Sequence, residues 1–280
     1  MEIRPTTSAD LPAQYQVFRA AICDLYERHS FRPPDPPEHA FVAQQAHLLR
    51  HDGERCFVAE EDGELAGFAA ALLREETWFF SSLFILPQFQ GRGIGKQLLT
   101  RAWGAEATRR LTLTDAIQPA SNGLYGKRGL IPSTPLLSLA GRCAIDAGDL
   151  EPASPDSTVV ALLDRAAYGF DRAPDHSFWQ ARAKLTLWLR GGEPVAYSYA
   201  WPHEQVGPVA GLDARAAADA LRAELGRRDE ASVRAPGSSA ELIGVALEAG
   251  LRMSATPGLL LLSREVVPPD ALAISGYALL

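Results

Sequence analysis

An apolar segment that runs directly into a glycine-rich turn constrains the fold of this chain more than any other feature. Residues 78–86 are nearly all apolar, which predicts a strand buried on both faces. Pro87 ends its pairing because proline has no N–H to donate. Gly91, Gly93 and Gly95 let the backbone turn without Cβ clashes, and a helix with an apolar stripe begins at once. Because unsatisfied N–H groups and the helix dipole converge there, the segment predicts a site for a phosphate or pyrophosphate.

Two common phosphate-binding motifs do not fit this turn. A Walker loop would need glycine at position 90 and serine or threonine at 97, where the chain has Gln90 and Gln97. A Rossmann fingerprint would need glycine at position 96, which is Lys96, and the turn lies some way into the chain behind predicted hairpins. The pattern that remains is Gln-x-x-Gly-x-Gly over residues 90–95.

The two halves of the chain share an order of features. Hairpins with a glycine in the turn are predicted around Gly63 and around 191–192, and each lies between apolar runs. Glycines that end a helix, Gly129 and Gly250, each precede a loop and a further strand. Residues 143–157 are acidic and contain proline, glycine and serine, as linkers do. We therefore predict a domain over 1–142, a linker over 143–157 and a second domain over 158–280 that arose by duplication.

Composition narrows the function classes. Hydrophobic residues make up 47% of the 280 residues, which indicates a folded chain. The net charge is −7 and Lys and Arg are not clustered, so nucleic acid is not the expected partner. With no long apolar run, no charged leader and three widely spaced cysteines, we expect a cytoplasmic protein without a membrane segment or disulfides. The sequence has neither CxxC nor HExxH, so no metal is expected.

The glycine pattern resembles the pyrophosphate loop of the GNAT superfamily of acetyl-CoA-dependent N-acetyltransferases, Arg/Gln-x-x-Gly-x-Gly/Ala. The opening Ile-Arg-Pro-x-Thr-x-x-Asp-Leu over residues 3–11 and the segment Asn-Gly-Leu-Tyr-Gly-Lys-Arg-Gly-Leu over 122–130 also look like that family. The resemblance implies an α/β (α+β) fold of two tandem GNAT-like domains, each with a mixed, mostly antiparallel twisted sheet flanked by helices. The segment around 211–218 has no glycine cradle and contains Asp213, so the second domain is expected to be degenerate and not to bind CoA.

Carried over to this chain, the resemblance implies a set of acetyl-CoA contacts. Backbone N–H groups of the splayed fourth strand would hold the carbonyl and pantetheine arm, and the turn would hold the pyrophosphate. Asn122 matches a position that contacts the pantetheine arm, although asparagine is also a common helix N-cap. The expected contacts are Phe84, Ile85, Gln90, Gly91, Arg92, Gly93, Ile94, Gly95, Lys96 and Asn122.

Tyr125 matches the usual general acid of the family, which protonates the departing thiolate; the alternative is a core aromatic residue. Glu60, Glu75, Glu76 and Asp115 are candidate bases, and none is assigned because the family often uses ordered water. The expected reaction is direct attack of a primary amine, small-molecule or peptide, on acetyl-CoA. The alternatives are a sensor that binds acyl-CoA without turnover and an enzyme for longer acyl chains. The second half would form a homodimer face or one wall of the acceptor pocket.

Overall fold

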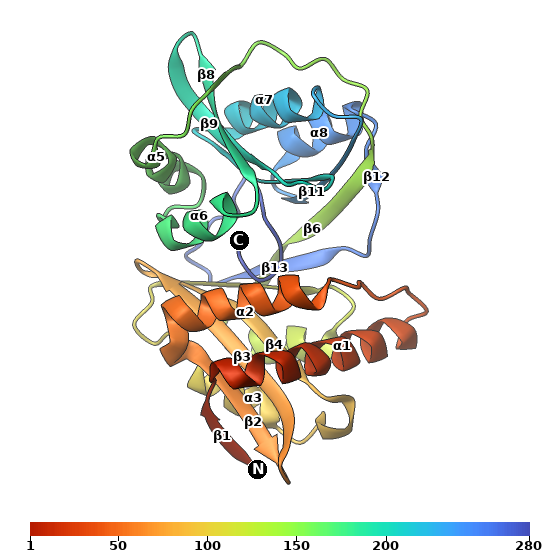
Figure 1. Cartoon of the computed structure of the whole chain (residues 1–280). Helices are drawn as coiled ribbons and strands as arrows, with labels where there is room; N and C mark the ends of the chain where they lie inside the picture. The colour runs from red at the N-terminus through yellow and green to blue at the C-terminus, as the bar shows by residue number, and fades with distance from the viewer. The chain divides into compact units, whose positions relative to one another are not determined.

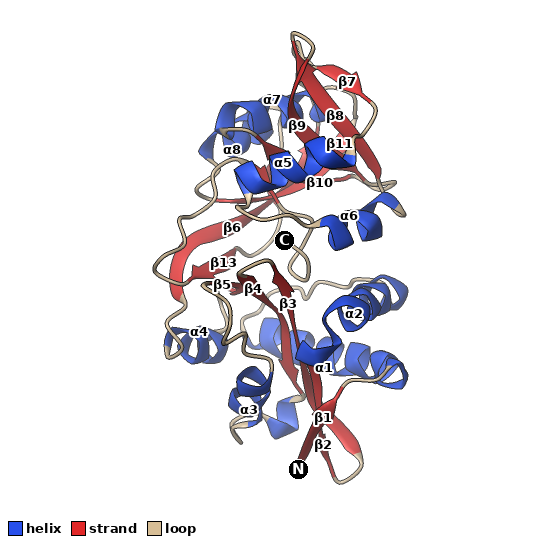
Figure 2. Ribbon diagram, turned by 90° about the vertical axis from the view of Figure 1, so that its left-hand side faces the viewer, coloured by secondary structure: helices blue, strands red, loops and turns tan.

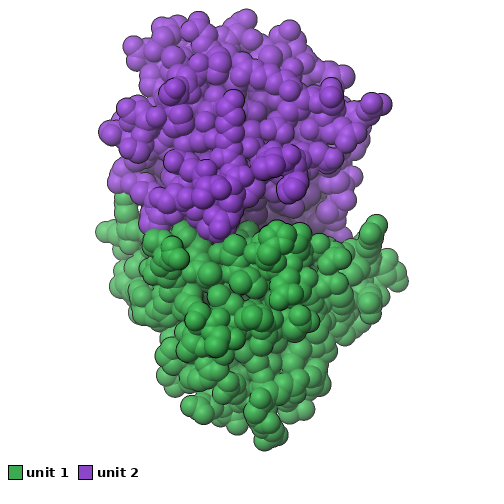
Figure 3. Space-filling model, in the orientation of Figure 1, with its two compact units in different colours: residues 1–112, 117–130 green, residues 113–116, 131–280 purple.

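The computed structural model describes residues 1–280, which divide into two compact units coloured separately in Figure 3. Unit 1 comprises Met1–Thr112 and Ile117–Leu130, and unit 2 comprises Leu113–Ala116 and Ile131–Leu280. The units therefore change over at 130–131 and not within 143–157. Residues 143–157 are joined to unit 2, since β7 (Glu151–Ala153) pairs with β8 (Lys184–Arg190) and the Cys143 N–H donates to the Asp229 carbonyl.

The elements that begin in unit 1 are β1 (Glu2–Pro5), α1 (Leu11–Arg28), α2 (Glu38–Asp52), β2 (Cys56–Glu61), β3 (Glu64–Arg74), β4 (Thr77–Ile85), α3 (Ile94–Arg101), β5 (Arg109–Asp115) and α4 (Pro119–Gly126), with short 3-10 turns at Ser8–Asp10, Gly53–Arg55 and Pro87–Phe89. Figure 1 labels most of these elements, and Figure 2 also labels β5 and α4.

The sheet of unit 1 has the order β1-β2-β3-β4-β5. Neighbouring strands are antiparallel except β4 and β5, which run parallel. In Figure 2, α1 and α2 cover one face of this sheet, and α3 and α4 lie on the other. The first face is sealed by apolar side chains from both layers, among them Val17, Phe41 and Phe68. This packing fixes the strands whose ends form the site described below.

Unit 2 contains the remaining elements. They are β6 (Ile131–Arg142), β7, α5 (Ser157–Ala167), α6 (Ala173–Gln180), β8, β9 (Glu193–Ala200), β10 (Gln205–Gly211), α7 (Ala214–Leu225), β11 (Glu230–Pro236), α8 (Ala240–Glu248), β12 (Arg252–Met253), β13 (Gly258–Leu262) and β14 (Leu272–Ala273). Within this unit the order is β13-β6-β11-β10-β9-β8-β7, with β12 on β6 and β14 on β10.

Side-chain alternation along β9 explains how the helices of unit 2 are placed. Successive residues of a strand point to opposite faces. Tyr197 and Tyr199 contact residues of α5 and α6, whereas the Ser198 hydroxyl contacts Glu224 of α7. The helix pairs α5–α6 and α7–α8 therefore cover opposite faces of the sheet, since α7 packs on α8 in a cluster that includes Leu221, Leu242 and Ala246.

The two units repeat one element order, as the sequence predicts. Each has a strand, two helices, three antiparallel strands, a helix, a strand parallel to the one before it, and another helix. Both predicted hairpins form with two consecutive positive φ angles, at Asp62 and Gly63 and at Gly191 and Gly192, as a type I′ turn requires. Gly129 and Gly250, with φ of 84° and 101°, end α4 and α8. The mixed, mostly antiparallel fold with flanking helices is confirmed.

Candidate functional site

Strand β4 ends in an opening of the sheet. Its pairing with β5 covers only Thr77 to Phe80, although β4 continues to Ile85. On the other side it stays paired with β3, and the Leu86 N–H donates to the Ala66 carbonyl at 2.9 Å. Because N–H directions alternate along a strand, the Ile85 N–H points to the open side and the Phe84 N–H points to β3. Of these two predicted contacts, only the Ile85 N–H faces the opening.

The glycine turn follows directly and leads into α3. Gly91 and Gly93 have φ of 78° and 81°, and the place of a Cβ at either residue has no atom within 4 Å. Gly93 is the N-cap of α3, so no side chain caps the helix. The N–H groups of its first turn have no intrahelical acceptor, and the first turn has no acidic residue. This is open, uncapped and electropositive backbone, which suits an anion.

Side chains around the turn have defined roles. The Gln90 amide donates to the Ile85 carbonyl at 3.0 Å, and this bond ties the turn to the end of β4. The Arg92 guanidinium lies 5.1 Å from the Phe89 ring centroid and 3.7 Å from Glu61. Lys96 is exposed on the first turn of α3. Arginine and lysine thus add positive charge beside the backbone cradle.

Gly95 brings the separate parts of the predicted site together. It is helical and not left-handed, so its role differs from that of Gly91 and Gly93. A Cβ there would lie 3.7 Å from Leu83, 3.9 Å from Ile85 and 3.9 Å from Leu124. The start of α3, the end of β4 and helix α4 therefore meet at this residue.

Helix α4 carries the remaining two predicted residues. Gln118 is its N-cap, so Asn122 lies inside the helix and the alternative role as an N-cap is wrong. Tyr125 is 4% exposed and stands edge-on to Phe80, with ring centroids 5.8 Å apart. Burial raises the pKa of the Tyr125 phenol above its ordinary value, and a hydrogen bond with Ser121 partly offsets this. The hydroxyl therefore stays protonated at neutral pH and can serve as a proton donor.

The candidate bases differ in their surroundings. Glu60 accepts a 2.5 Å hydrogen bond from Arg4, and the Thr108 hydroxyl donates to Glu76 at 2.9 Å. Glu75 occupies a left-handed turn position with φ of 52°, and Asp115 is half-buried at the end of β5. None of these contacts singles out one carboxylate as a base.

Unit 2 lacks an equivalent cradle at the corresponding place. Asp213 is the N-cap of α7, and its carboxylate accepts the Ala216 N–H at 2.7 Å. A Cβ at Gly211 would lie 2.4 Å from the Ala217 nitrogen, so this glycine serves close packing of strand on helix. A helix N-terminus that is capped by its own carboxylate is not a phosphate site.

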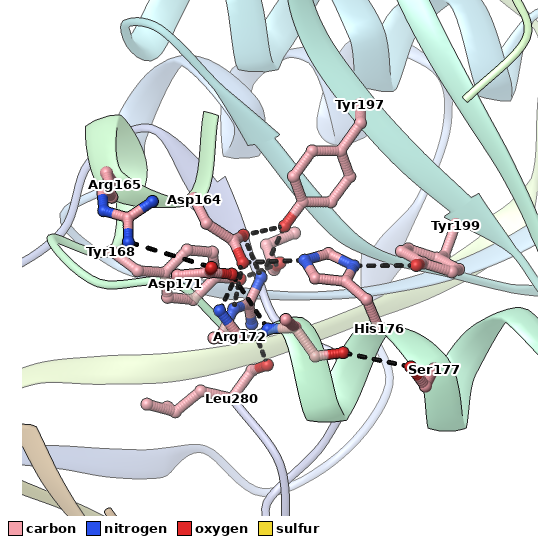
Figure 4. Close-up of polar contacts among 12 residues, drawn as sticks. Asp164, Arg165, Tyr168, Asp171, Arg172, His176, Ser177, Tyr197, Tyr199 and Leu280 are labelled. Atoms are coloured by element: carbon pink, nitrogen blue, oxygen red, sulfur yellow. Dashed lines mark hydrogen bonds and ion pairs between the residues drawn. The ribbon is translucent and has the colours of Figure 1, made fainter. Parts of the chain in front are cut away.

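Unit 2 also contains a buried polar network that the sequence does not predict, shown in Figure 4. Asp164 accepts from Arg172 at 2.9 Å, from His176 Nε2 at 2.7 Å and from the Tyr197 hydroxyl at 2.5 Å. His176 Nδ1 lies 2.8 Å from the Tyr199 hydroxyl. All five side chains are buried, so the network joins α5 and α6 to β9. Its members are scattered over 36 positions of sequence with no motif spacing.

A family model covers the segment that contains the glycine turn and α4. Residues 19–130 match the model of the acetyltransferase (GNAT) family. The matched segment holds the end of β4, the glycine turn and α4. Over these residues the chain therefore matches a GNAT acetyltransferase domain.

Curated relatives match over part of their length. An aminoglycoside N(6')-acetyltransferase type 1 of Salmonella typhimurium is 31% identical over 93 residues, which is 29% of this chain and 64% of the relative. An uncharacterized N-acetyltransferase of Archaeoglobus fulgidus is 38% identical over 65 residues, covering 20% of this chain and 42% of the relative. The chain thus spans less than two thirds of the curated relatives it matches.

Solved structures match over nearly the whole chain. A Pyrococcus horikoshii protein, provisionally described as an acetyltransferase, has a TM-score of 0.78 at 16% identity and covers 99% of this chain and 95% of its own. A GCN5-related N-acetyltransferase of Sphaerobacter thermophilus has a TM-score of 0.65 at 18% identity and covers 96% of this chain and 98% of its own. A tandem GNAT protein from the clavulanic acid biosynthesis pathway has a TM-score of 0.58 at 15% identity and covers 96% of this chain and 99% of its own. Over nearly its whole length the chain therefore has a fold like that of these three proteins, one of which is a tandem GNAT protein.

Two further observations concern membranes and metals. None of the helices is both long and apolar enough to cross a bilayer. No group of three or more His, Cys, Asp or Glu side chains is placed to hold a metal ion.

Proposed function

We propose that this chain is an N-acetyltransferase that transfers the acetyl group of acetyl-CoA to a primary amine by direct attack. The observation that carries the proposal is the uncapped N-terminus of α3, preceded by two left-handed glycines and placed beside the open end of β4. This arrangement offers N–H donors to a pyrophosphate and, a few residues away, the Ile85 N–H to an acyl or amide carbonyl.

Each residue has a defined part in the proposed reaction. The N–H groups of residues 90–96 bind the pyrophosphate, and Ile85 and Asn122 hold the pantetheine arm. The amine nitrogen attacks the thioester carbon, its bond to carbon forms, and the bond from carbon to sulfur breaks. The Tyr125 hydroxyl gives its proton to the departing thiolate, and the amine loses a proton to water. Burial of Tyr125 supports this role, because it keeps the phenol protonated until negative charge develops on sulfur.

The acceptor is proposed only as a class, an amine on a small molecule or peptide. The matched Salmonella typhimurium relative is named for acetylation of aminoglycosides at the 6' nitrogen. An aminoglycoside carries the primary amine that the reaction requires, so this class belongs in a first panel together with amino acids, polyamines and peptides. We propose no single carboxylate as the base.

Thiol release measured with acetyl-CoA and this amine panel tests the proposal. The expected result is thiol release that depends on one amine of the panel, together with the acetylated form of that amine in mass spectrometry. Acetyl-CoA binding in calorimetry without amine-dependent release would assign the chain as an acyl-CoA sensor instead. Absence of CoA binding would contradict both functions.

A further inference from the structure

Unit 2 has an open surface pocket that plays no part in the proposed transfer. It has a volume of about 480 Å³ and lies where α6 ends, β8 begins and β9 ends. Its charged lining residues are Arg182, Lys184 and Arg228, and no Asp or Glu lines it. Gln180, Trp201, Pro202 and three alanines complete the lining. The volume lies within the range of small-molecule sites, about 300–1,000 Å³.

The two arginines among the three cations have printed contacts that position them and leave N–H donors over, and Lys184 is exposed. Arg182 donates one N–H to the Phe178 carbonyl at 2.8 Å and lies over the Phe178 ring, 3.9 Å from its centroid. Arg228 Nε is 3.7 Å from Glu224, whose other oxygen accepts the Ser198 hydroxyl at 2.9 Å. A guanidinium has five N–H groups, so each arginine has donors left for a ligand.

The charge of the pocket is poorly balanced. Glu224 is buried and lies beside Arg228, so it offsets one positive charge. Arg182 and Lys184 take part in no ion pair. The carbonyls at the end of α6 would repel an anion, but the Trp179 carbonyl already accepts the N–H groups of Arg182 and Ala183 at 2.8 Å.

Two residues of the pocket wall, Trp201 and Gln180, are held by hydrogen bonds. The Trp201 indole N–H donates to the Gly207 carbonyl at 2.7 Å, which fixes the ring. The Gln180 side chain is hydrogen-bonded to the Tyr199 hydroxyl, which in turn contacts His176 of the buried network. Side chains that are already ordered in this way lose little conformational entropy when a ligand binds.

We propose that this basic pocket, lined by Gln180, Arg182, Lys184, Trp201 and Arg228, binds a small, multiply charged anion. Two unpaired cations and spare guanidinium donors converge on one space of ligand size, and the planar donor fork of arginine matches both phosphate and carboxylate oxygens. The pocket lies outside the glycine turn of unit 1, so the ligand would be recognised separately from the pyrophosphate of CoA.

Calorimetry with two probes, inorganic pyrophosphate and citrate, tests the proposal and separates a phosphate ligand from a carboxylate one. The protein carries Gly93→Asp throughout, so that the turn 90–96 does not contribute. We compare it with the same protein bearing Arg182→Gln and Lys184→Gln, both exposed residues. The matched control is Arg190→Gln at the other end of β8, whose guanidinium pairs with Asp219 at 2.5 Å.

The expected result is binding of at least one probe that weakens about tenfold or more in the double variant and not in the control, since each lost charge-assisted hydrogen bond is worth a factor of this size. Raising the ionic strength should weaken the same binding. The preferred probe identifies the class of anion. Equal affinity in the double variant, or no binding of either probe to the parent, would overturn the proposal. Circular dichroism of the variants checks that the fold is kept.

Discussion

Gly93 is the residue on which the pyrophosphate proposal depends most directly. We expect Gly93→Asp to abolish CoA binding in calorimetry, because a carboxylate would point into the open space in front of the α3 N-terminus. Gly63→Asp is the matched control, since Gly63 has φ of 80° and no atom within 4 Å of a Cβ. Both variants should cost about 1–2 kcal/mol of stability for the left-handed backbone. If both bound CoA equally well, the turn would not be the pyrophosphate site.

Tyr125 offers a second test at this scale. We expect Tyr125→Phe to lower kcat about a hundredfold while the KM for acetyl-CoA changes little, because the hydroxyl acts only when charge builds on sulfur. The ring remains to pack edge-on against Phe80, so thermal unfolding should shift little. Since burial raises the pKa of the phenol above 10, its ionisation should not limit the rate below that pH. An unchanged kcat, with chemistry shown to limit the rate, would exclude this role.

At the scale of elements, the Asp164 carboxylate holds α5 and α6 to β9. Burial by itself would raise its pKa, but the charge of Arg172 and the hydrogen bond from His176 outweigh burial and hold the pKa well below the ordinary value. A carboxyl with a lowered pKa in the folded state stabilises fully above its unfolded pKa, near 3.9. That stabilisation is lost as the pH falls further toward the folded pKa.

We therefore expect Asp164→Asn to lower the free energy of unfolding by about 3–5 kcal/mol at neutral pH, because it leaves the buried Arg172 charge without a carboxylate. Asp219→Asn is the control: its ion pair with Arg190 is exposed, and its loss should cost under about 1 kcal/mol. Urea unfolding followed by circular dichroism measures both. The wild type should lose stability below about pH 4, and the Asp164 variant should show less of this loss. Equal costs for the two variants would mean that the network does not stabilise unit 2.

At the scale of the whole molecule, the two units differ at the helix N-terminus that would bind CoA, and this difference predicts unequal ligand binding. We expect calorimetry to give one CoA site per chain, since the α3 N-terminus is open and the α7 N-terminus is capped by Asp213. Asp213→Gly removes that cap and should change the stoichiometry little, because Gly211 still packs its backbone on Ala217. Two CoA sites per wild-type chain would show that the second half is not degenerate.

The glycine turn, the two hairpins and the repeated element order could be predicted from local sequence. Gly91, Gly93 and the paired turn residues have left-handed φ angles. Such angles are adopted mainly by glycine, asparagine and aspartate, so these residue types predict the turns. The apolar run before the turn likewise predicted a buried strand. The residue type of Asp213 also indicated that it would oppose phosphate, although only the fold shows that it caps α7.

Only the tertiary structure decided the rest. The register of β4 on β3 determines that the Ile85 N–H faces the open side of the sheet and the Phe84 N–H faces β3. Register depends on the partner strand, so residues 84 and 85 alone could not reveal it. Strand β6 belongs to unit 2 because it pairs with β11 and β13. The residues of a strand do not by themselves determine which strands it pairs with. The Asp164 network and the basic pocket likewise assemble from separate elements. Burial and convergence of charges are properties of packing, so no spacing along the chain could have revealed them.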